Sequence, residues 1–324
     1  MRSKMSLARM LPALALAALL AVSCNTGGYR TFQGYAQGGV YTVKYNAKGV
    51  TASPQEVRDS VEALLTAIDF SVSGYNRNSI LSRRNAGEEV EPDRYYSELR
   101  EISEHYREIT GGAFDAAAGP LFDIWGFGFT RDTMPDQAAV DAALSLCREG
   151  RRLNFNAIAQ GYTCDIVASY LHSLGVKDML VDIGEIYCEG LNPSGEGWKI
   201  GIDNPVDGNN SPGADLRGVW QSDGGAHGVV TSGNYRKFYV RDGRKYSHTI
   251  DPRTGYPVSH SLLSATIVAP TATEADALAT YCMVIGPEAA REFVLARPDI
   301  EACLISADSL WTSPGFQIPD LRPE

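Results

Sequence analysis

The sequence predicts an α+β fold in which helices pack on mixed, largely antiparallel sheets. Helix and strand patterns follow one another without the regular alternation of a doubly wound parallel sheet. Residues 198–250 are rich in strand patterns. Within them, Asp242-Gly243 separates two strand-like runs, and this dipeptide is a strong signal for a tight hairpin between antiparallel strands.

The first half of the chain supplies strands and helices in turn. A strand is predicted over 39–46, where side chains alternate between two faces. A helix over 53–70 follows from apolar residues at helical spacing, opened by a Ser-Pro pair that suits a cap and a first turn. Further helices are predicted over about 95–110 and 161–174, each followed by glycine, and a short apolar strand over 178–183.

The second half is expected to complete the sheet. The predicted hairpin spans 236–250, and the Gly-, Asn- and Ser-rich stretch 203–228 is predicted to be a surface excursion. A last helix is predicted over 273–285. The strands around Ile267 and Leu304 are predicted to pair with each other.

The first residues have the pattern of an export signal. Basic residues precede an apolar stretch too short to span a bilayer, so residues 1–23 are predicted to be a signal peptide. The sequence up to Cys24 resembles a bacterial lipobox, in which the cysteine becomes the lipidated first residue; an ordinary cleaved signal is the alternative. We expect a membrane-anchored lipoprotein of the bacterial cell envelope, facing the periplasm, with a lipidated tether at 24–38 and a single domain at 39–324.

Charge and cysteine content exclude other classes of protein. The formal net charge is −10, and basic residues occur only in short pairs such as Arg83-Arg84 and Arg151-Arg152, so nucleic acid is not an expected partner. The cysteines beyond Cys24 have no CxxC spacing and lie mostly in apolar surroundings. They are interpreted as buried thiols and not as a disulfide framework or zinc site, although export permits one oxidised pair.

Residues 154–162, Asn-Phe-Asn-Ala-Ile-Ala-Gln-Gly-Tyr, lead directly into a predicted helix. Small side chains at Ala157, Ala159 and Gly161 allow another group to approach the backbone. Free amides at a helix start attract anionic phosphates. Tight packing of the helix on a sheet is an equally good explanation of this pattern.

Asp276 and Thr280 stand one turn apart on the last predicted helix and share a face. A carboxylate and a hydroxyl offered together are hard oxygen ligands, suited to Mg²⁺ that keeps waters and phosphate oxygens in its remaining shell. The alternative is structural, because Thr273 followed three residues later by Asp276 resembles a helix cap.

Residues 246–255 are predicted to form a strand that ends in a proline-glycine turn. His248 at the strand end is placed where a general base could reach a substrate hydroxyl, and Arg253 in the turn could meet a phosphate. A structural histidine beside a tyrosine is the alternative. Tyr75 and the run Ala113-Phe114-Asp115 add aromatic rings and a carboxylate beside glycines, which suits a ring system, although core packing also explains them.

The ordered set of these segments resembles the ApbE family, the FAD:protein FMN transferases once described as thiamine biosynthesis lipoproteins. The likeness runs from about Gly34 to about Gly286. Its marks in this chain are SGYNRNSILSRRN, GGAFDAAAGPLFDIWGFG, LNFNAIAQGYTCD, VDIGEIYCEG, GIDNP, VVTSGNYRKF, YSHTIDPRTGYPV and TEADALAT. Eight such segments in register make the resemblance specific.

The resemblance implies an ApbE-like fold and assigns roles to individual residues. It implies that Mg²⁺ is bound by the Ala157 carbonyl, Asp276 and Thr280, and that His248 is the base. It implies contacts with FAD along the nucleotide at Ser232 and Gly233. The flavin-contacting positions that it implies are Tyr75, Ala113, Phe114, Asp115, Asn154 and Gln160; Arg253 joins them as our candidate phosphate contact.

The resemblance also implies the reaction: Mg-dependent transfer of FMN from FAD to a Thr or Ser hydroxyl of an exported acceptor flavoprotein, with release of AMP. An FAD pyrophosphatase or a non-catalytic FAD-binding lipoprotein is the alternative. The chain departs from the family pattern in three ways. Gly38-Gly39-Val40 stands where Met-Gly-Thr is usual, Asn154 and Gln160 replace an aspartate and a lysine, and Gly184-Glu185 replaces a double glycine.

Overall fold

The protein was analysed as a computed structural model that describes residues 28–128, 134–150, 152–209, 211–236, 238–241 and 243–318. The predicted signal peptide and Cys24 lie outside these residues. Among the described residues, no helix is both long and apolar enough to cross a membrane.

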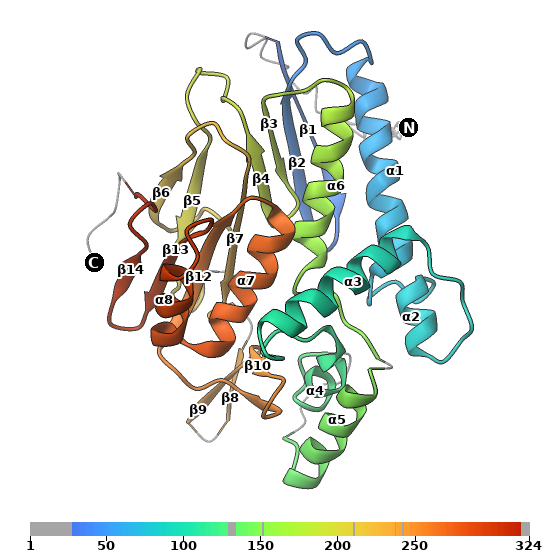
Figure 1. Cartoon of the computed structure of the whole chain (residues 1–324), viewed down its shortest axis with the longest axis vertical. Helices are drawn as coiled ribbons and strands as arrows, with labels where there is room; N and C mark the ends of the chain where they lie inside the picture. The colour runs from blue at the N-terminus through green and yellow to red at the C-terminus, as the bar shows by residue number, and fades with distance from the viewer. Residues whose placement is uncertain are drawn as a thin grey trace, which may run out of the picture.

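Eight strands of the described chain form one sheet, and every neighbouring pair in it is antiparallel (Figure 1). This confirms the predicted α+β class. In spatial order the strands are β1 (Tyr29–Ala36), β2 (Gly39–Asn46), β3 (Met179–Asp182), β4 (Ile186–Glu189), β7 (His227–Gly233), β12 (Leu262–Ala269), β13 (Glu301–Ser306) and β14 (Leu310–Thr312). The described two-stranded sheets pair β5 (Lys199–Asp203) with β6 (Leu216–Gln221), β8 (Phe238–Arg241) with β9 (Arg244–Ser247), and β10 (Ile250–Asp251) with β11 (Tyr256–Pro257).

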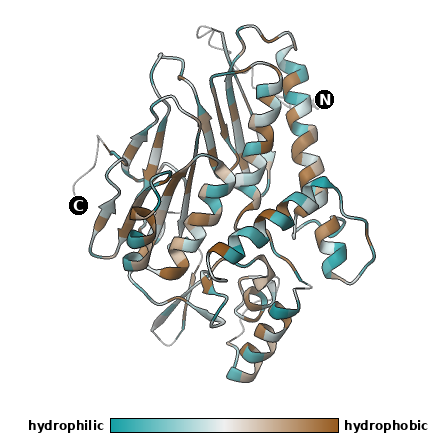
Figure 2. Cartoon of the chain, in the orientation of Figure 1, coloured by the Kyte–Doolittle hydropathy of each residue, from teal (hydrophilic) through white to brown (hydrophobic). Residues whose placement is uncertain are grey.

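Helices cover one face of the large sheet, with α6 and α7 side by side in front of it (Figure 1). Figure 2 shows hydrophobic and hydrophilic residues alternating along α1 and α3, as expected of helices with one face on a core. The described helices are α1 (Pro54–Val72), α2 (Ile80–Asn85), α3 (Arg94–Ile109), the 3₁₀ turn η1 (Ala116–Ala118), α4 (Gly119–Ile124), α5 (Gln137–Glu149), α6 (Ala159–Ser173), α7 (Ala272–Ile285) and α8 (Pro287–Leu295).

Most elements predicted from sequence periodicity are confirmed. Helix α1 opens with a capping box, in which the Ser53 hydroxyl accepts from the Glu56 amide and the Glu56 carboxylate accepts from the Ser53 amide. Strands β12 and β13 pair with Ile267 opposite Ala302 and Leu304 opposite Ala265. The predicted hairpin is β8–β9, although Asp242 at its tip lies outside the described residues.

Two interpretations were wrong. Residues 29–36 of the predicted tether form the edge strand β1, paired with β2 along its whole length. Only one face of an edge strand is buried, so polar and glycine residues can fill the other, and the composition resembled a linker. The stretch 203–228 contains β6, on which Trp220 is 4% exposed, so it is part of the fold and not only a surface excursion.

The cysteine interpretation is confirmed within the described residues. Cys147, Cys164, Cys188, Cys282 and Cys303 are all buried and free. Burial raises the pKa of the Cys282 thiol to about 12, which keeps it protonated and unreactive at neutral pH.

Candidate active site

A cavity of about 340 Å³ lies where the start of α6, the end of β7, helix α7 and the turn after β9 meet. We call it the central cavity. It brings together residues that lie far apart in the sequence, from Tyr75 to Val284. The predicted site residues that line it are Tyr75, Ala113, Phe114, Asp115, Asn154, Ala157, Gln160, Ser232, Gly233, His248, Asp276 and Thr280.

The close approach of α6 to α7 places the small-residue segment beside Asp276. The amide of Gly161 donates to Asp276 Oδ2 at 3.0 Å. A Cβ at Gly161 would lie 2.2 Å from the Ala272 carbonyl oxygen and 2.8 Å from Asp276 Cβ, so only glycine fits there. The Asp165 carboxylate, one turn further along α6, accepts from the amides of Ala272 and Thr273 at 2.9 and 2.8 Å and fixes the start of α7.

This contact gives a first prediction. Gly161→Ala is expected to push α7 away from α6 and to destabilise the fold by about 3 kcal/mol, because an added methyl in a packed interior forces backbone shifts. Thermal unfolding measures the effect. Gly39→Ala is the matched control, since a Cβ there meets nothing within 4 Å. Equal melting temperatures for the two variants would contradict the close helix approach.

Asp276 is a buried carboxyl that does not cap its own helix, α7. Its side chain is 4% exposed, and burial raises its pKa to about 7 despite the opposing hydrogen bond from Gly161. The N-cap of α7 is Thr271, whose hydroxyl accepts from the Glu274 amide at 3.1 Å, and the Thr273 hydroxyl donates to Asp165. The structural alternative, in which Asp276 caps the helix, is therefore wrong.

The oxygen atoms around Asp276 fit Mg²⁺. Thr280 follows one turn later on α7, and its hydroxyl lies 3.5 Å from Ser232 Oγ of β7. Between described residues, no hydrogen bond ends on the Ala157 carbonyl oxygen, because Gly161, four residues on, donates to Asp276. One carboxylate, one hydroxyl and one carbonyl form a hard, mostly neutral donor set. Such a set leaves coordination positions for water and phosphate oxygens.

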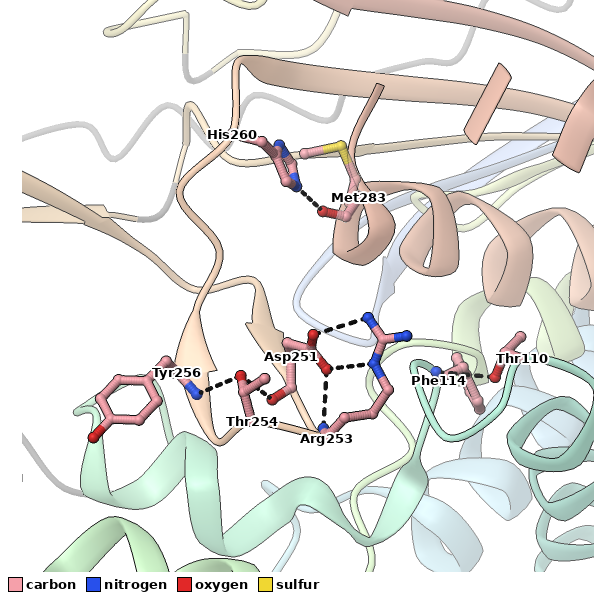
Figure 3. Close-up of polar contacts among 8 residues, drawn as sticks. All are labelled: Thr110, Phe114, Asp251, Arg253, Thr254, Tyr256, His260 and Met283. Carbon is pink, nitrogen blue, oxygen red and sulfur yellow. Dashed lines mark hydrogen bonds and ion pairs between the residues drawn. The ribbon is translucent and has the colours of Figure 1, made fainter. Parts of the chain in front are cut away.

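Phe114 and Asp115 are held by local hydrogen bonds on one wall of the central cavity. The Phe114 amide donates to the Thr110 hydroxyl at 3.1 Å (Figure 3). Asp115 Oδ1 accepts from the Ala117 amide at 2.7 Å and so caps η1. Burial raises the pKa of the Asp115 carboxyl, partly offset by the Arg107 guanidinium. These contacts give both side chains a fixed orientation.

Asn154 and Gln160, which replace the aspartate and lysine of the family pattern, take part in amide hydrogen bonds. Asn154 Oδ1 accepts from the Asn156 amide at 2.9 Å, and Asn156 Nδ2 donates to the Tyr75 hydroxyl at 3.2 Å. Gln160 Nε2 donates to the Ile183 carbonyl at 3.0 Å. Asn156 therefore ties the small-residue segment to the loop after α1, and Gln160 ties it to the loop between β3 and β4.

His248 and Arg253, which both lie between β9 and β11, border different cavities. His248 follows β9 and lines the central cavity, and its ring packs edge-on against Phe127 with centroids 6.3 Å apart. Arg253 does not line this cavity. Its guanidinium makes two hydrogen bonds of 2.9 Å to the Asp251 carboxylate (Figure 3), and it borders a neighbouring groove.

Several cavity residues were missed as site candidates. Glu185 lines the cavity, and burial together with the nearby Asp276 carboxylate raises its pKa well above its ordinary value. Arg236 also lines it and forms an ion pair with Asp203. Asn156 and Phe127 line it as well. Glu185 was visible only as a departure from the double glycine, and Phe127 only as part of an apolar run.

Comparisons with known proteins identify relatives along most of the chain. The ApbE family model matches residues 38–304. A FAD:protein FMN transferase of Escherichia coli (strain K12) is 32% identical over 291 residues, covering 81% of each chain. One from Vibrio cholerae (strain ATCC 39541, Classical Ogawa 395) is 33% identical over 301 residues, covering 85% of this chain and 87% of the relative.

Solved structures are similar over nearly the same length. The flavin transferase ApbE from Vibrio cholerae gives a TM-score of 0.76 at 28% identity, covering 88% of this chain and 97% of the other. The flavinyl transferase ApbE of Pseudomonas stutzeri, in its apo form, gives a TM-score of 0.74 at 33% identity, covering 88% of this chain and 94% of the other. By sequence and by structure, this chain belongs to the ApbE family.

Proposed function

We propose that this protein transfers FMN from FAD to a Thr or Ser hydroxyl of an exported acceptor flavoprotein and releases AMP, with Mg²⁺ as cofactor. The observation that carries the proposal is the convergence of Ala157, Asp276, Thr280 and His248 on the central cavity. Family membership supports it, because the relatives compared above are FAD:protein FMN transferases.

Different residues of the cavity have different roles in the proposed reaction. Ala157, Asp276 and Thr280 would hold Mg²⁺, which when bound neutralises phosphate charge. A ring nitrogen of His248 takes the proton of the acceptor hydroxyl, whose oxygen attacks the flavin-side phosphorus. The bond to the bridging oxygen breaks, and that oxygen leaves with AMP. The aromatic rings of Tyr75 and Phe114 orient the flavin.

Two alternatives use the same cavity. If water replaces the acceptor hydroxyl, the protein is an FAD pyrophosphatase that produces FMN and AMP. A non-catalytic FAD-binding lipoprotein would need neither Asp276 nor His248. The buried Asp276 carboxyl favours catalysis, because a storage protein would bear the desolvation cost of this group without any use for it.

Intact mass spectrometry tests the proposal. The purified protein is incubated with FAD, Mg²⁺ and exported flavoprotein domains, and each domain is then weighed. We expect one domain to gain the mass of one FMN unit and an equal amount of AMP to appear. AMP without any mass gain would show a pyrophosphatase, and FAD binding without AMP would show a storage protein.

The cellular location is part of the proposal. The signal-like residues 1–23 and Cys24 support a lipoprotein that faces the periplasm and meets exported acceptors there. Metabolic labelling with a palmitate analogue tests it. We expect label on the wild-type protein and none on Cys24→Ser; label on both would place the lipid elsewhere.

A further inference from the structure

A second cavity, of about 530 Å³, lies between α3 and α5 next to the central cavity. We call it the arginine groove, after Arg100 and Arg107 of α3, Arg148 of α5 and Arg253 after β10. Both helices contact η1, and Figure 1 shows α4 between them. Asp115, Ala116 and Pro252 line both cavities, so the groove and the central cavity share a wall.

The arginine groove carries unbalanced positive charge. Glu104 forms an ion pair with Arg107, and Asp251 forms one with Arg253. The side chains of Arg100 and Arg148 form no ion pair or hydrogen bond with any residue that the structure describes, although the charge of Arg100 helps to lower the pKa of Glu104. Glu104 and Asp115 are the acidic residues on its walls, and the first is already paired. Two guanidinium groups therefore remain available in a chain whose net charge is −10.

A buried hydroxyl on the floor of the groove also has no partner. Ser103 is 3% exposed and lines the groove, and within the described residues its Oγ makes no hydrogen bond. A buried polar group without a partner costs free energy. A ligand that offers a hydrogen-bonding group at this depth would remove that cost.

We propose that the arginine groove binds an acidic, extended segment of the acceptor protein and holds its hydroxyl beside the central cavity. The inference rests on the proposed transferase function. Arg100, Ser103 and Arg107 succeed one another along two turns of α3, a length of about 10 Å that suits several residues of an extended peptide. Arg100 and Arg148 pair with its carboxylates.

The apolar floor favours a polypeptide over a small anion. Leu144, Leu153 and Phe155 line the groove between the charged side chains. A peptide can place apolar side chains on this floor and carboxylates at the rim, whereas inorganic phosphate or AMP would use only the charges. The shared wall at Asp115 then brings the bound segment next to the cavity that contains His248.

Fluorescence anisotropy with two labelled peptides tests this inference. Both are short, extended and contain one threonine; one carries three aspartates and the other asparagines in their place. We expect the aspartate peptide to bind more tightly, with an affinity that falls in high salt. Arg100→Ala combined with Arg148→Ala should weaken its binding roughly tenfold, because two exposed ion pairs are lost.

The control removes equal charge elsewhere. Lys48→Ala with Lys177→Ala alters exposed lysines at the far end of β2 and β3 and should leave binding unchanged. Equal binding of the two peptides, or equal loss in both double variants, would overturn the inference. Displacement of the peptide by AMP or phosphate at comparable affinity would also overturn it, and would identify a small-anion site. Because anisotropy needs no catalysis, failure of FMN transfer would leave this result readable.

Discussion

Asp276→Asn is expected to lower AMP formation from FAD about a thousandfold. The carboxylate is the one charged ligand in the proposed Mg²⁺ set, and the loss of several kcal/mol of charge stabilisation corresponds to that factor. Asparagine keeps the volume, and its side-chain oxygen can still accept from the Gly161 amide. Steady-state AMP release with saturating FAD and Mg²⁺ measures the effect.

The same variant should gain stability, and this separates chemistry from folding. The pKa of Asp276 is raised from 3.8 to about 7, so the folded protein retains a proton that the unfolded chain loses near pH 4. The wild type therefore loses stability as pH rises from about 4 to 7, and the loss is constant above that. Without metal, the advantage of the Asp276→Asn variant in melting temperature should grow across this window.

The matched control is Glu274→Gln, two residues earlier on α7. Glu274 pairs with Arg297 and does not line the central cavity. We expect nearly wild-type AMP release from it. Normal activity in Asp276→Asn would rule out the proposed metal ligand, and a melting temperature below that of Glu274→Gln would make Asp276 a structural residue.

Local patterns were sufficient for helices with one apolar face and for strands that are apolar along their length. Helix α1 follows from apolar spacing and a capping box, and β12–β13 from two apolar strands. The edge strand β1 could not be recognised, because its pairing with β2 decides its structure and its exposed face carries polar residues. Strand β6 was hidden in a polar stretch for a similar reason, although Trp220 is buried.

The site residues likewise divide into those that the sequence predicted and those that only the fold reveals. Asp276 and Thr280 were predictable because helical spacing alone puts them on one face. Ala157 and His248 were candidates from their local sequence, and the resemblance assigned their roles. The arginine groove could not be predicted, because its basic residues are scattered from Arg100 to Arg253 and form no cluster in the sequence. Only the fold, in which α3 and α5 both contact η1, brings them together. Glu185 was hidden for a related reason, because its burial depends on neighbouring elements.

His248→Ala is expected to lower FMN transfer by about 10²–10⁴-fold while leaving FAD binding intact. General bases contribute rate enhancements of this size, and alanine removes the ring that would accept the hydroxyl proton. The ring contacts Phe127 at the cavity wall, so a modest loss of packing is also expected. The rate of mass gain of the acceptor and the FAD dissociation constant are measured separately.

Two other histidines serve as controls for His248, one structural and one exposed. His260 is a structural residue whose Nε2 bonds to the Met283 carbonyl at 2.9 Å (Figure 3), so His260→Gln should lower the melting temperature. His105 is exposed on α3 outside the central cavity, and His105→Ala should change neither property. If His248→Ala behaved like the His260 variant, with reduced stability but a normal transfer rate for the folded fraction, the base would have to be another group in the cavity.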